Sequence, residues 1–307
     1  MKKTISRRHF TSLTLAGVGA LFIPSCMSAR SDSPGVSRIA GVELGVQSYS
    51  YRDRSLAEAI RAIRDLGLRS CELWAGHIEP SESVWQRGQS NEEARKKSEI
   101  LRRWKDSLTE SDIRKVREQF NATGIRIQAY NAAIKDKTSD ADIDQQFQIA
   151  QWLGTDLLTT SATVKVMKRV NTAAEKYHIR VGMHNHANIQ DPNEFATPES
   201  FARGMEGNSE LIGINLDIGH FTAANYDPLQ FIEENHKKIF SIHLKDRKKD
   251  QGPRTRFGEG DTPVAEVLKL IRDKNWPIPA NIEYEYSGDT DEEMKSIVDF
   301  CRNVLQN

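Results

Sequence analysis

Residues 212–244 read IGINLDIGHFTAANYDPLQFIEENHKKIFSIHL, and this segment shows the repeating unit of the chain. Ile212–Asp217 and Ile239–Leu244 are short apolar runs of the kind that forms buried strands. Between them, Pro228–Lys237 has the spacing of apolar residues expected of a helix. An alternation of strand, helix and strand predicts parallel strands that are joined by right-handed crossovers.

The same alternation continues over most of the chain and gives eight pairs of a strand and a helix. The predicted strands are Leu44–Ser50, Arg69–Trp74, Ile125–Tyr130, Asp156–Thr160, Arg180–His184, Ile212–Asp217, Ile239–Leu244 and Ala280–Glu285. The predicted helices are Ser55–Leu66, Ala141–Leu153, Val164–Tyr177, Pro198–Met205, Pro228–Lys237, Pro263–Asp273 and Asp291–Leu305, besides the polar stretch Ser81–Thr109. Eight such units predict a single-domain (β/α)8 barrel, the TIM barrel, over residues 41–307. No glycine-rich dinucleotide fingerprint follows the first strand, which disfavours an open doubly wound sheet.

The polar stretch Ser81–Thr109 follows the second strand and is rich in Glu, Arg and Lys. Two interpretations stay open. It forms a pair of solvated helices, or it is an insertion that covers an active site.

The N-terminus has the composition of an export signal. Lys2 and Lys3 give it a charged start, and Ser6–Phe10, with the letters SRRHF, matches the twin-arginine pattern. The apolar run Thr14–Pro24 is too short to span a bilayer as a stable helix. We therefore expect residues 1–29 to be removed on export to the periplasm, and no transmembrane helix to remain.

A linker, residues 30–40, joins this signal to the predicted barrel. Ile23–Cys26 also resembles a lipobox. Lipid anchoring at Cys26, and simple loss of Cys26 with the signal, both stay open.

Charge and cysteine content limit the class of partner. Lys and Arg number 43, as do Asp and Glu, and loss of the signal removes four basic residues, leaving 39 against 43. This acidic balance argues against nucleic acid as the partner. Cys71 and Cys301 are isolated thiols, so we expect no disulfide framework. The sequence leaves open whether the barrel forms a homodimer.

Candidate functional residues gather at the ends of the last four strands, where the active sites of such barrels lie. Four of the eight histidines are at these ends, together with two acidic residues: His184, His186, His220, His243, Asp217 and Glu283. Imidazole and carboxylate groups together suit one divalent ion such as Mn, Co, Zn or Mg. A cation would also offset the cost of burying carboxylates at the mouth of a barrel.

These strand ends resemble those of the xylose isomerase-like barrel superfamily, which includes the sugar phosphate isomerases and epimerases. The similar patterns are Asp-x-Gly-His after the sixth strand, His-x-Lys-Asp after the seventh and a single Glu on the eighth. The resemblance implies that Asp217, His243 and Glu283 are metal ligands. His184 is the fourth expected ligand, in a place where the superfamily usually has Glu. The histidine at this position disfavours a symmetric mechanism with two carboxylates. In this respect the sequence resembles dehydratase-like members of the superfamily.

The resemblance implies a small carbohydrate substrate and a common first chemical step. A metal ion stabilises the enediolate that forms when a base removes the proton next to a carbonyl. Glu283 or Glu285 is the expected base, and His184, His186 and His220 are the alternative acids and bases. Return of the proton gives an isomerase or epimerase, whereas loss of a β-leaving group gives a lyase or dehydratase.

Other residues near the strand ends have candidate roles in substrate binding. Lys245 either holds a substrate oxygen or forms a salt bridge with Glu283 or Asp217. Tyr49 and Trp74 either form an aromatic wall for a sugar or pack in the core. Arg254 or Arg256, in the loop after the seventh strand, either reaches an anionic group of the substrate or is solvated.

The sequence disfavours two other functions of such a barrel. A non-catalytic carbohydrate-binding barrel is disfavoured because the predicted ligands are present. Apurinic endonucleases share this barrel but need three zinc ions, with ligands on the early strands. The third and fourth strands here end in Gln128–Asn131 and Thr159–Ser161, which offer few ligands.

Overall fold

The computed structural model describes residues 37–84 and 88–307, which belong to one compact unit of the chain. The predicted export signal, the lipobox at Cys26 and the first part of the linker lie outside the described residues. None of the helices in the described ranges is long and apolar enough to cross a membrane.

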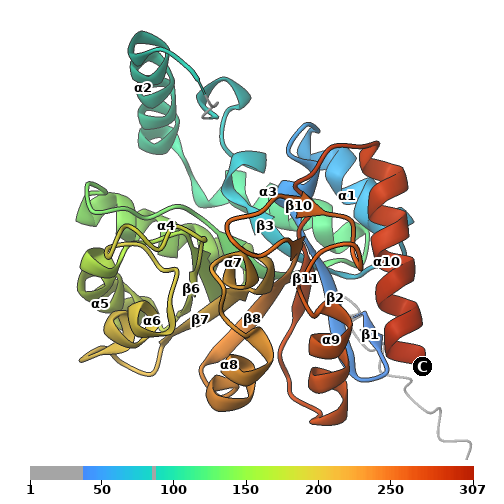
Figure 1. The fold of residues 1–307 in the computed structure, drawn as a ribbon. Coiled ribbons are helices and arrows are strands. Elements are labelled where there is room, and N and C mark those ends of the chain that lie inside the picture. The colour runs from blue at the N-terminus through green and yellow to red at the C-terminus, as the bar shows by residue number, and fades with distance from the viewer. Residues whose placement is uncertain (1–36, 85–87) are drawn as a thin grey trace, which may run out of the picture. The chain divides into compact units, whose positions relative to one another are not determined.

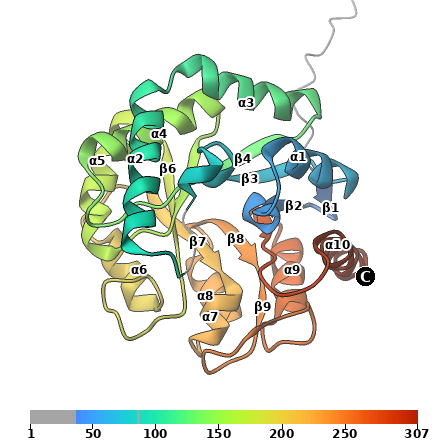
Figure 2. The same cartoon turned by 90° about the horizontal axis from the view of Figure 1, so that it is seen from above.

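Eight parallel strands form a closed barrel (Figures 1 and 2). These strands are β2 (Val42–Gln47), β3 (Ser70–Trp74), β4 (Arg126–Asn131), β5 (Leu157–Thr160), β6 (Arg180–His184), β7 (Ile212–Asp217), β8 (Ile239–Leu244) and β11 (Ala280–Ile282). Each pairs with the next, and β11 pairs with β2 to close the ring. The predicted (β/α)8 fold is therefore confirmed. A short additional strand, β1 (Arg38–Ile39), pairs antiparallel with β2.

Helices surround the ring of strands, as the view from above shows (Figure 2). They are α1 (Leu56–Asp65), α3 (Glu110–Ala122), α4 (Asp140–Leu153), α5 (Met167–Tyr177), α6 (Pro198–Met205), α7 (Ile218–Ala223), α8 (Pro228–Asn235), α9 (Val264–Asp273) and α10 (Thr290–Gln306). The first helix illustrates why they form where they do. Ser55 and Glu58 make a reciprocal capping box at its start, and Ala59, Ile60 and Ile63 form its buried face.

The polar stretch after the second strand contains α2 (Asn91–Ser107), which has no buried residue and projects away from the barrel wall (Figure 1). The described residues of Ser81–Thr109 thus contain one α-helix and a 3-10 turn at Ser81–Ser83, where a pair of solvated helices was one of the two interpretations. The next helix, α3, begins beyond this stretch and packs on the barrel through Ile113 and Phe120. Residues of α2 are absent from the lining of the barrel-mouth pocket in the described part of the chain.

Two strands end earlier than predicted, because a serine hydroxyl replaces the bonds between the first and last strands. β2 ends at Gln47 and β11 ends at Ile282. Ser50 Oγ donates to the carbonyl of Ile282 at 3.3 Å and accepts from the backbone N–H of Tyr284 at 3.0 Å. Glu283 and Glu285 therefore lie just beyond the barrel wall, at its mouth.

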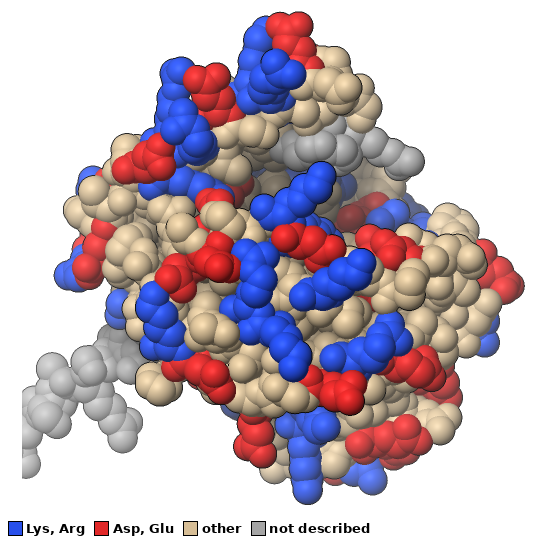
Figure 3. Space-filling model, turned by 90° about the vertical axis from the view of Figure 1, so that its left-hand side faces the viewer, with Lys and Arg blue, Asp and Glu red and all other residues tan. Residues whose placement is uncertain are grey.

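Both remaining cysteines, Cys71 and Cys301, are free and buried, as predicted. The face that carries α4 and α5 shows Lys and Arg mixed with Asp and Glu (Figure 3). Several of these charges form pairs, among them Arg169 with Asp140 and Lys176 with Asp144. This face therefore presents no field of one sign.

Candidate metal centre and active site

The four predicted metal ligands lie together at the carboxyl-terminal mouth of the barrel. His184, Asp217 and His243 are at or near the ends of β6, β7 and β8, and Glu283 follows β11 directly. All four are buried, and one ligand atom from each lies within 4.8 Å of the others. The register of the barrel explains this, because Asp217 pairs with His243 across β7 and β8.

Two atoms of this cluster lack the hydrogen bonds that buried polar atoms normally make. Nδ1 of His184 and Oδ2 of Asp217 have no hydrogen-bond partner among the described residues. Oδ2 of Asp217 is 2.9 Å from Lys245 Nζ as an ion pair, without the geometry of a hydrogen bond. Burial lowers the pKa of His184 well below its usual range, so its ring is neutral. Neutral imidazole is the form that binds metal, so the residues fit a divalent ion.

Lys245 supplies the internal positive charge of the site. Its Nζ lies 2.9 Å from Asp217 Oδ2, 3.1 Å from Glu283 Oε2 and 2.6 Å from Glu285 Oε2. Burial lowers the pKa of Lys245, but these carboxylates outweigh burial and raise it. Lys245 is absent from the residues that line the pocket. The structure thus shows the salt-bridge alternative for Lys245, behind the carboxylates.

The carboxylates of the cluster respond differently to the same burial. Burial raises the pKa of Asp217, although Lys245 opposes this. Burial also raises the pKa of Glu283, but Lys245 and then His243 reverse the effect and hold it well below its usual range. Glu283 is therefore ionised, as a metal ligand must be.

His220 and His186 occupy different environments. His220 is buried, with Lys245 Nζ 3.2 Å from its Nε2 and Arg247 Nη1 2.7 Å from its Nδ1. Burial, followed by the charge of Lys245, lowers its pKa well below the usual range. His186 lines the pocket with 40% of its side chain exposed, and its nearest carboxylate oxygen, from Glu194, is 3.8 Å away. Both rings line the pocket, and His186 is the more exposed of the two.

The cluster opens into a pocket of about 190 Å³, smaller than the roughly 300–1,000 Å³ of sites for drug-sized ligands. Tyr49 and Trp74 both line it, and their rings meet edge to face at 5.0 Å. They thus form an aromatic wall. The pocket lining consists of Gln47, Tyr49, Trp74, Asn131, Ser161, His184, His186, His220, His243, Arg254, Glu283 and Glu285.

The two candidate arginines of the loop after β8 point to different places. Arg254 lines the pocket and its Nε lies 2.9 Å from Glu285 Oε2. Arg256, predicted to bind substrate, instead forms an ion pair with Glu293 of α10, with its Nε 2.9 Å from Oε1, and does not line the pocket. The reason is local. The hairpin strand β10 (Arg254–Thr255), paired with β9 (Asp246–Arg247), ends before Arg256, and a turn begins there.

Asp246 holds this loop in place. Its carboxylate accepts backbone N–H groups from Gly258 at 2.8 Å, Gly260 at 3.0 Å and Thr262 at 3.2 Å. A Cβ atom on Gly260 would overlap Asp246 Oδ1, so the turn needs glycine there. The Gly-Glu-Gly-Asp segment is thus tied to the strand end that carries His243.

Sequence reasoning missed one buried acidic residue, Glu72 of β3. Both of its carboxylate oxygens are 2.9 Å from His243 Nε2, on the side of the ring opposite Glu283. A usable signal was present. Glu72 is two residues before Trp74 in the same strand, so both side chains lie on one face of that strand.

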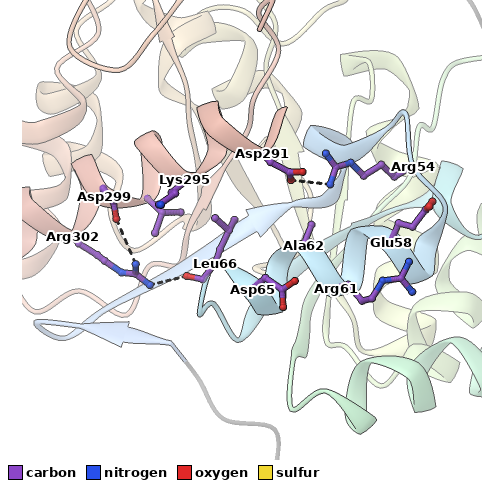
Figure 4. Close-up of a pocket in the computed structure, with 11 residues that line it drawn as sticks. Arg54, Glu58, Arg61, Ala62, Asp65, Leu66, Asp291, Lys295, Asp299 and Arg302 are labelled. Atoms are coloured by element: carbon purple, nitrogen blue, oxygen red, sulfur yellow. Dashed lines mark hydrogen bonds and ion pairs between the residues drawn. The ribbon is translucent and has the colours of Figure 1, made fainter. Parts of the chain in front are cut away.

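A larger groove of about 480 Å³ lies between α1 and α10 (Figure 4). Its charged groups include the ion pair of Arg54 with Asp291, and Arg302 Nη2 donates to the carbonyl of Leu66 at 2.7 Å. It holds no histidine, and it lacks the buried unpaired atoms found at the barrel mouth. The chemistry is therefore expected at the smaller pocket.

A closed (β/α)8 barrel with a buried His, Asp, His and Glu cluster at its mouth belongs to the class of barrels that can hold a catalytic metal. Within that class, the chain belongs to the xylose isomerase-like TIM barrel family, whose sequence profile matches residues 60–304. The family resemblance predicted from the strand ends is confirmed.

One curated relative, the uncharacterized protein MJ1311 of Methanocaldococcus jannaschii, is 29% identical over 114 residues. The matched part covers 36% of this chain and 38% of that relative, which is well under two thirds of its length.

Several solved structures share the fold. A sugar phosphate isomerase/epimerase from Parabacteroides distasonis has a TM-score of 0.60 and 15% identity, covering 87% of this chain and 98% of that one. The 3-keto-D-glucoside 4-epimerase YcjR from E. coli has a TM-score of 0.61 and 12% identity, covering 85% and 99%. The IOLI protein, solved with a binding zinc atom, has a TM-score of 0.58 and 14% identity, covering 86% and 94%. At these identities the likeness shows the fold alone.

Proposed function

We propose that this chain is a divalent-metal-dependent isomerase or epimerase of a small sugar. The observation that carries the proposal is the cluster of four ligand atoms within 4.8 Å of one another, in which a buried ring nitrogen has no partner among the described residues. Membership of a family that includes sugar isomerases and epimerases supports the same function.

The donor set favours particular ions. His184 and His243 supply imidazole, and Asp217 and Glu283 supply carboxylate. Two imidazoles suit Zn, Co or Mn better than Mg. The zinc atom in the IOLI structure is in line with this preference. When bound, the ion would act as a Lewis acid towards the carbonyl oxygen of the substrate.

Glu285 is the proposed base. It lines the pocket, is 15% exposed at its side chain and is held by Lys245 at 2.6 Å and Arg254 at 2.9 Å. Glu283 is deeper and belongs to the ligand cluster. Glu285 therefore removes the proton next to the substrate carbonyl and, in an isomerisation, returns it to the neighbouring carbon. In an epimerisation an acid on the opposite face would supply the new proton, and His186, which lines the pocket, is the candidate. Tyr49 and Trp74 hold the sugar against this carboxylate.

A lyase is the second candidate. The position of His184 and the exposure of His186 favour it. His184 stands where the family usually has Glu, which removes one of two symmetric carboxylates. His186 lines the pocket with its ring partly exposed. In an elimination, Glu285 takes the proton next to the carbonyl, the bond to the β-oxygen breaks, and His186 gives that leaving oxygen a proton.

Solvent exchange distinguishes these functions. The full chain, loaded with Zn, Co or Mn, is incubated with keto-sugars and 3-keto-glycosides in deuterated water. We expect deuterium at one carbon of an intact sugar. Release of water or an aglycone together with an unsaturated sugar would establish the lyase instead. Absence of exchange and of cleavage with every sugar would overturn both and favour a carbohydrate-binding barrel.

Export to the periplasm, lipid attachment at Cys26 and homodimer formation stay predictions. The first two rest on residues outside the described part of the chain. Cleavage of the signal on export and lipid attachment would be tested by the N-terminal residue and the mass of the mature protein, measured on protein from the producing cells.

A further inference from the structure

Glu72 is a buried carboxylate at the centre of the barrel, beneath the candidate metal cluster. It is fully buried, and it does not line the pocket. Its only ion pair among the described residues is with His243, whose Nε2 lies 2.9 Å from both carboxylate oxygens. Contact with the substrate is therefore excluded, and any role of Glu72 must act through His243.

Donors from neighbouring strands contact both oxygens of the Glu72 carboxylate. Thr159 Oγ1 donates to its Oε1 at 2.7 Å, and Gln47 Nε2 lies 3.4 Å from the same oxygen. Asn281 Nδ2 donates to its Oε2 at 3.1 Å. Because both oxygens already accept from these donors, the carboxylate acts as the acceptor in its contact with His243, and His243 Nε2 acts as the donor. The amide nitrogen of Asn215 also lies 3.1 Å from Nε2, but two carboxylate oxygens outweigh one amide.

The hydrogen on Nε2 of His243 determines whether Nδ1, the other ring nitrogen, can offer a lone pair to a cation. When Nε2 carries the hydrogen, the lone pair of the neutral imidazole is on Nδ1. Nδ1 faces the ligand cluster and lies 2.8 Å from Glu283 Oε2, to which it donates in the metal-free chain. A bound cation would take the place of that hydrogen. The two carboxylates therefore lie on opposite sides of one ring, Glu72 below it and Glu283 beside the cluster.

We propose that Glu72 is a positioning residue for the metal centre. Its two oxygens, both 2.9 Å from Nε2, fix the orientation of the His243 ring, so that Nδ1 faces the cation. This inference rests on the metal site proposed above. Carboxylates that orient a ligating histidine typically change metal affinity by roughly 10- to 100-fold when they are removed.

The test compares Glu72→Gln with the wild-type full chain. The amide keeps the size of the side chain but loses the charge and offers an N–H group to Nε2. We expect roughly 10- to 100-fold weaker binding of Zn and Co, measured by titration against a competing chelator. Nitrogen NMR of the zinc-loaded chain, labelled at histidine, should show a protonated Nε2 on His243 in the wild type. In Glu72→Gln that signal should be lost or shifted.

The matched control is Glu43→Gln. Glu43 is another buried carboxylate, near the start of β2 and away from the cluster, where Ser70 and Arg126 bind it. It should leave both metal affinity and the His243 signal unchanged, even where thermal stability falls. Should Glu72→Gln not fold, Glu72→Asp keeps the charge, and its affinity should lie below that of the wild type.

The outcomes separate this inference from the proposed function. Metal affinity and a His243 signal that are the same in the wild type and both Glu72 variants would overturn the role of Glu72 and leave the metal site standing. A wild-type chain that binds none of Zn, Co or Mn would overturn the metal site, and this inference with it.

Discussion

At the scale of single residues, His184 combines burial with an unused ring nitrogen. It is 6% exposed, and its Nδ1 has no hydrogen-bond partner in the described part of the chain. A buried polar atom without a hydrogen bond lowers the free energy of unfolding by roughly 1–3 kcal/mol. A divalent ion would remove this cost, so the unpaired nitrogen is evidence for the ligand set that does not depend on family resemblance.

Replacement of His243 should remove the metal. His243→Ala deletes one of four ligands and the ring that links Glu72 to Glu283. We expect metal content to fall from about one ion per chain to near zero, measured by elemental analysis of purified protein. His236→Ala, which alters a histidine at the end of α8, is the control and should keep its metal. Unchanged metal content in His243→Ala would contradict the ligand assignment.

The charge of His243 makes the stability of the metal-free chain depend on pH. Burial lowers its pKa, but Glu72 and Glu283 outweigh burial and raise it to about 10. A group whose pKa is raised on folding stabilises the protein fully below its unfolded pKa of about 6.5 and loses that contribution as pH rises. Chelator-treated protein should therefore lose unfolding free energy between about pH 6.5 and 10, measured by urea denaturation. His243→Gln should show a flatter profile, and an equally steep one would count against this account.

At the scale of elements, the turn at Gly258–Asp261 positions Arg254 over the pocket. Gly260→Ala would drive a Cβ atom into the carboxylate of Asp246. We expect a loss of roughly 1–3 kcal/mol in stability, together with a lower kcat/KM on the sugar identified by solvent exchange. Glu259→Ala changes an exposed neighbour in the same turn and should match the wild type in both measurements. A Gly260→Ala variant with wild-type stability would refute the proposed anchor.

The strands and helices were predictable from sequence where one periodic signal dominated. Parallel strands buried on both faces appear as apolar runs, and seven of the surrounding helices were expected close to their observed bounds. The ends of β2 and β11 were not predictable, because there the hydroxyl of Ser50 replaces ladder bonds by donating to Ile282, which is 232 residues further along the chain. The direction of Arg256 depends likewise on Glu293 of a distant helix.

The site was predictable for residues that sit at strand ends, because barrel topology places those ends together. Glu72 was missed because it acts deeper in the barrel, through contacts with β5, β8 and β11. For Lys245 a substrate contact and a salt bridge were both open, and its three carboxylate partners come from the ends of two strands, β7 and β11. Only the folded structure shows that Lys245 forms salt bridges with these carboxylates, because the sequence does not reveal which groups surround it.

At the scale of the whole molecule, the metal should stabilise the barrel, because its ligands come from four strand ends that only the folded chain brings together. An ion at 100 times its dissociation constant adds about 2.7 kcal/mol to the free energy of unfolding. That corresponds to a rise of roughly 5 °C or more in Tm. Thermal unfolding with zinc and with a chelator would measure it. His243→Ala serves as the control and should show the same Tm in both.

Barrel closure between β2 and β11 also sets the order of events when the protein is made. β2 begins at Val42 and β11 begins at Ala280, so the two strands that close the ring are the first and the last of its eight strands to be synthesised. Until β11 and Glu283 have been made, neither the closed ring nor its fourth ligand exists. Metal insertion should therefore follow synthesis of the whole barrel, and a chain cut short before β11 would have three ligands and no closed wall to hold them.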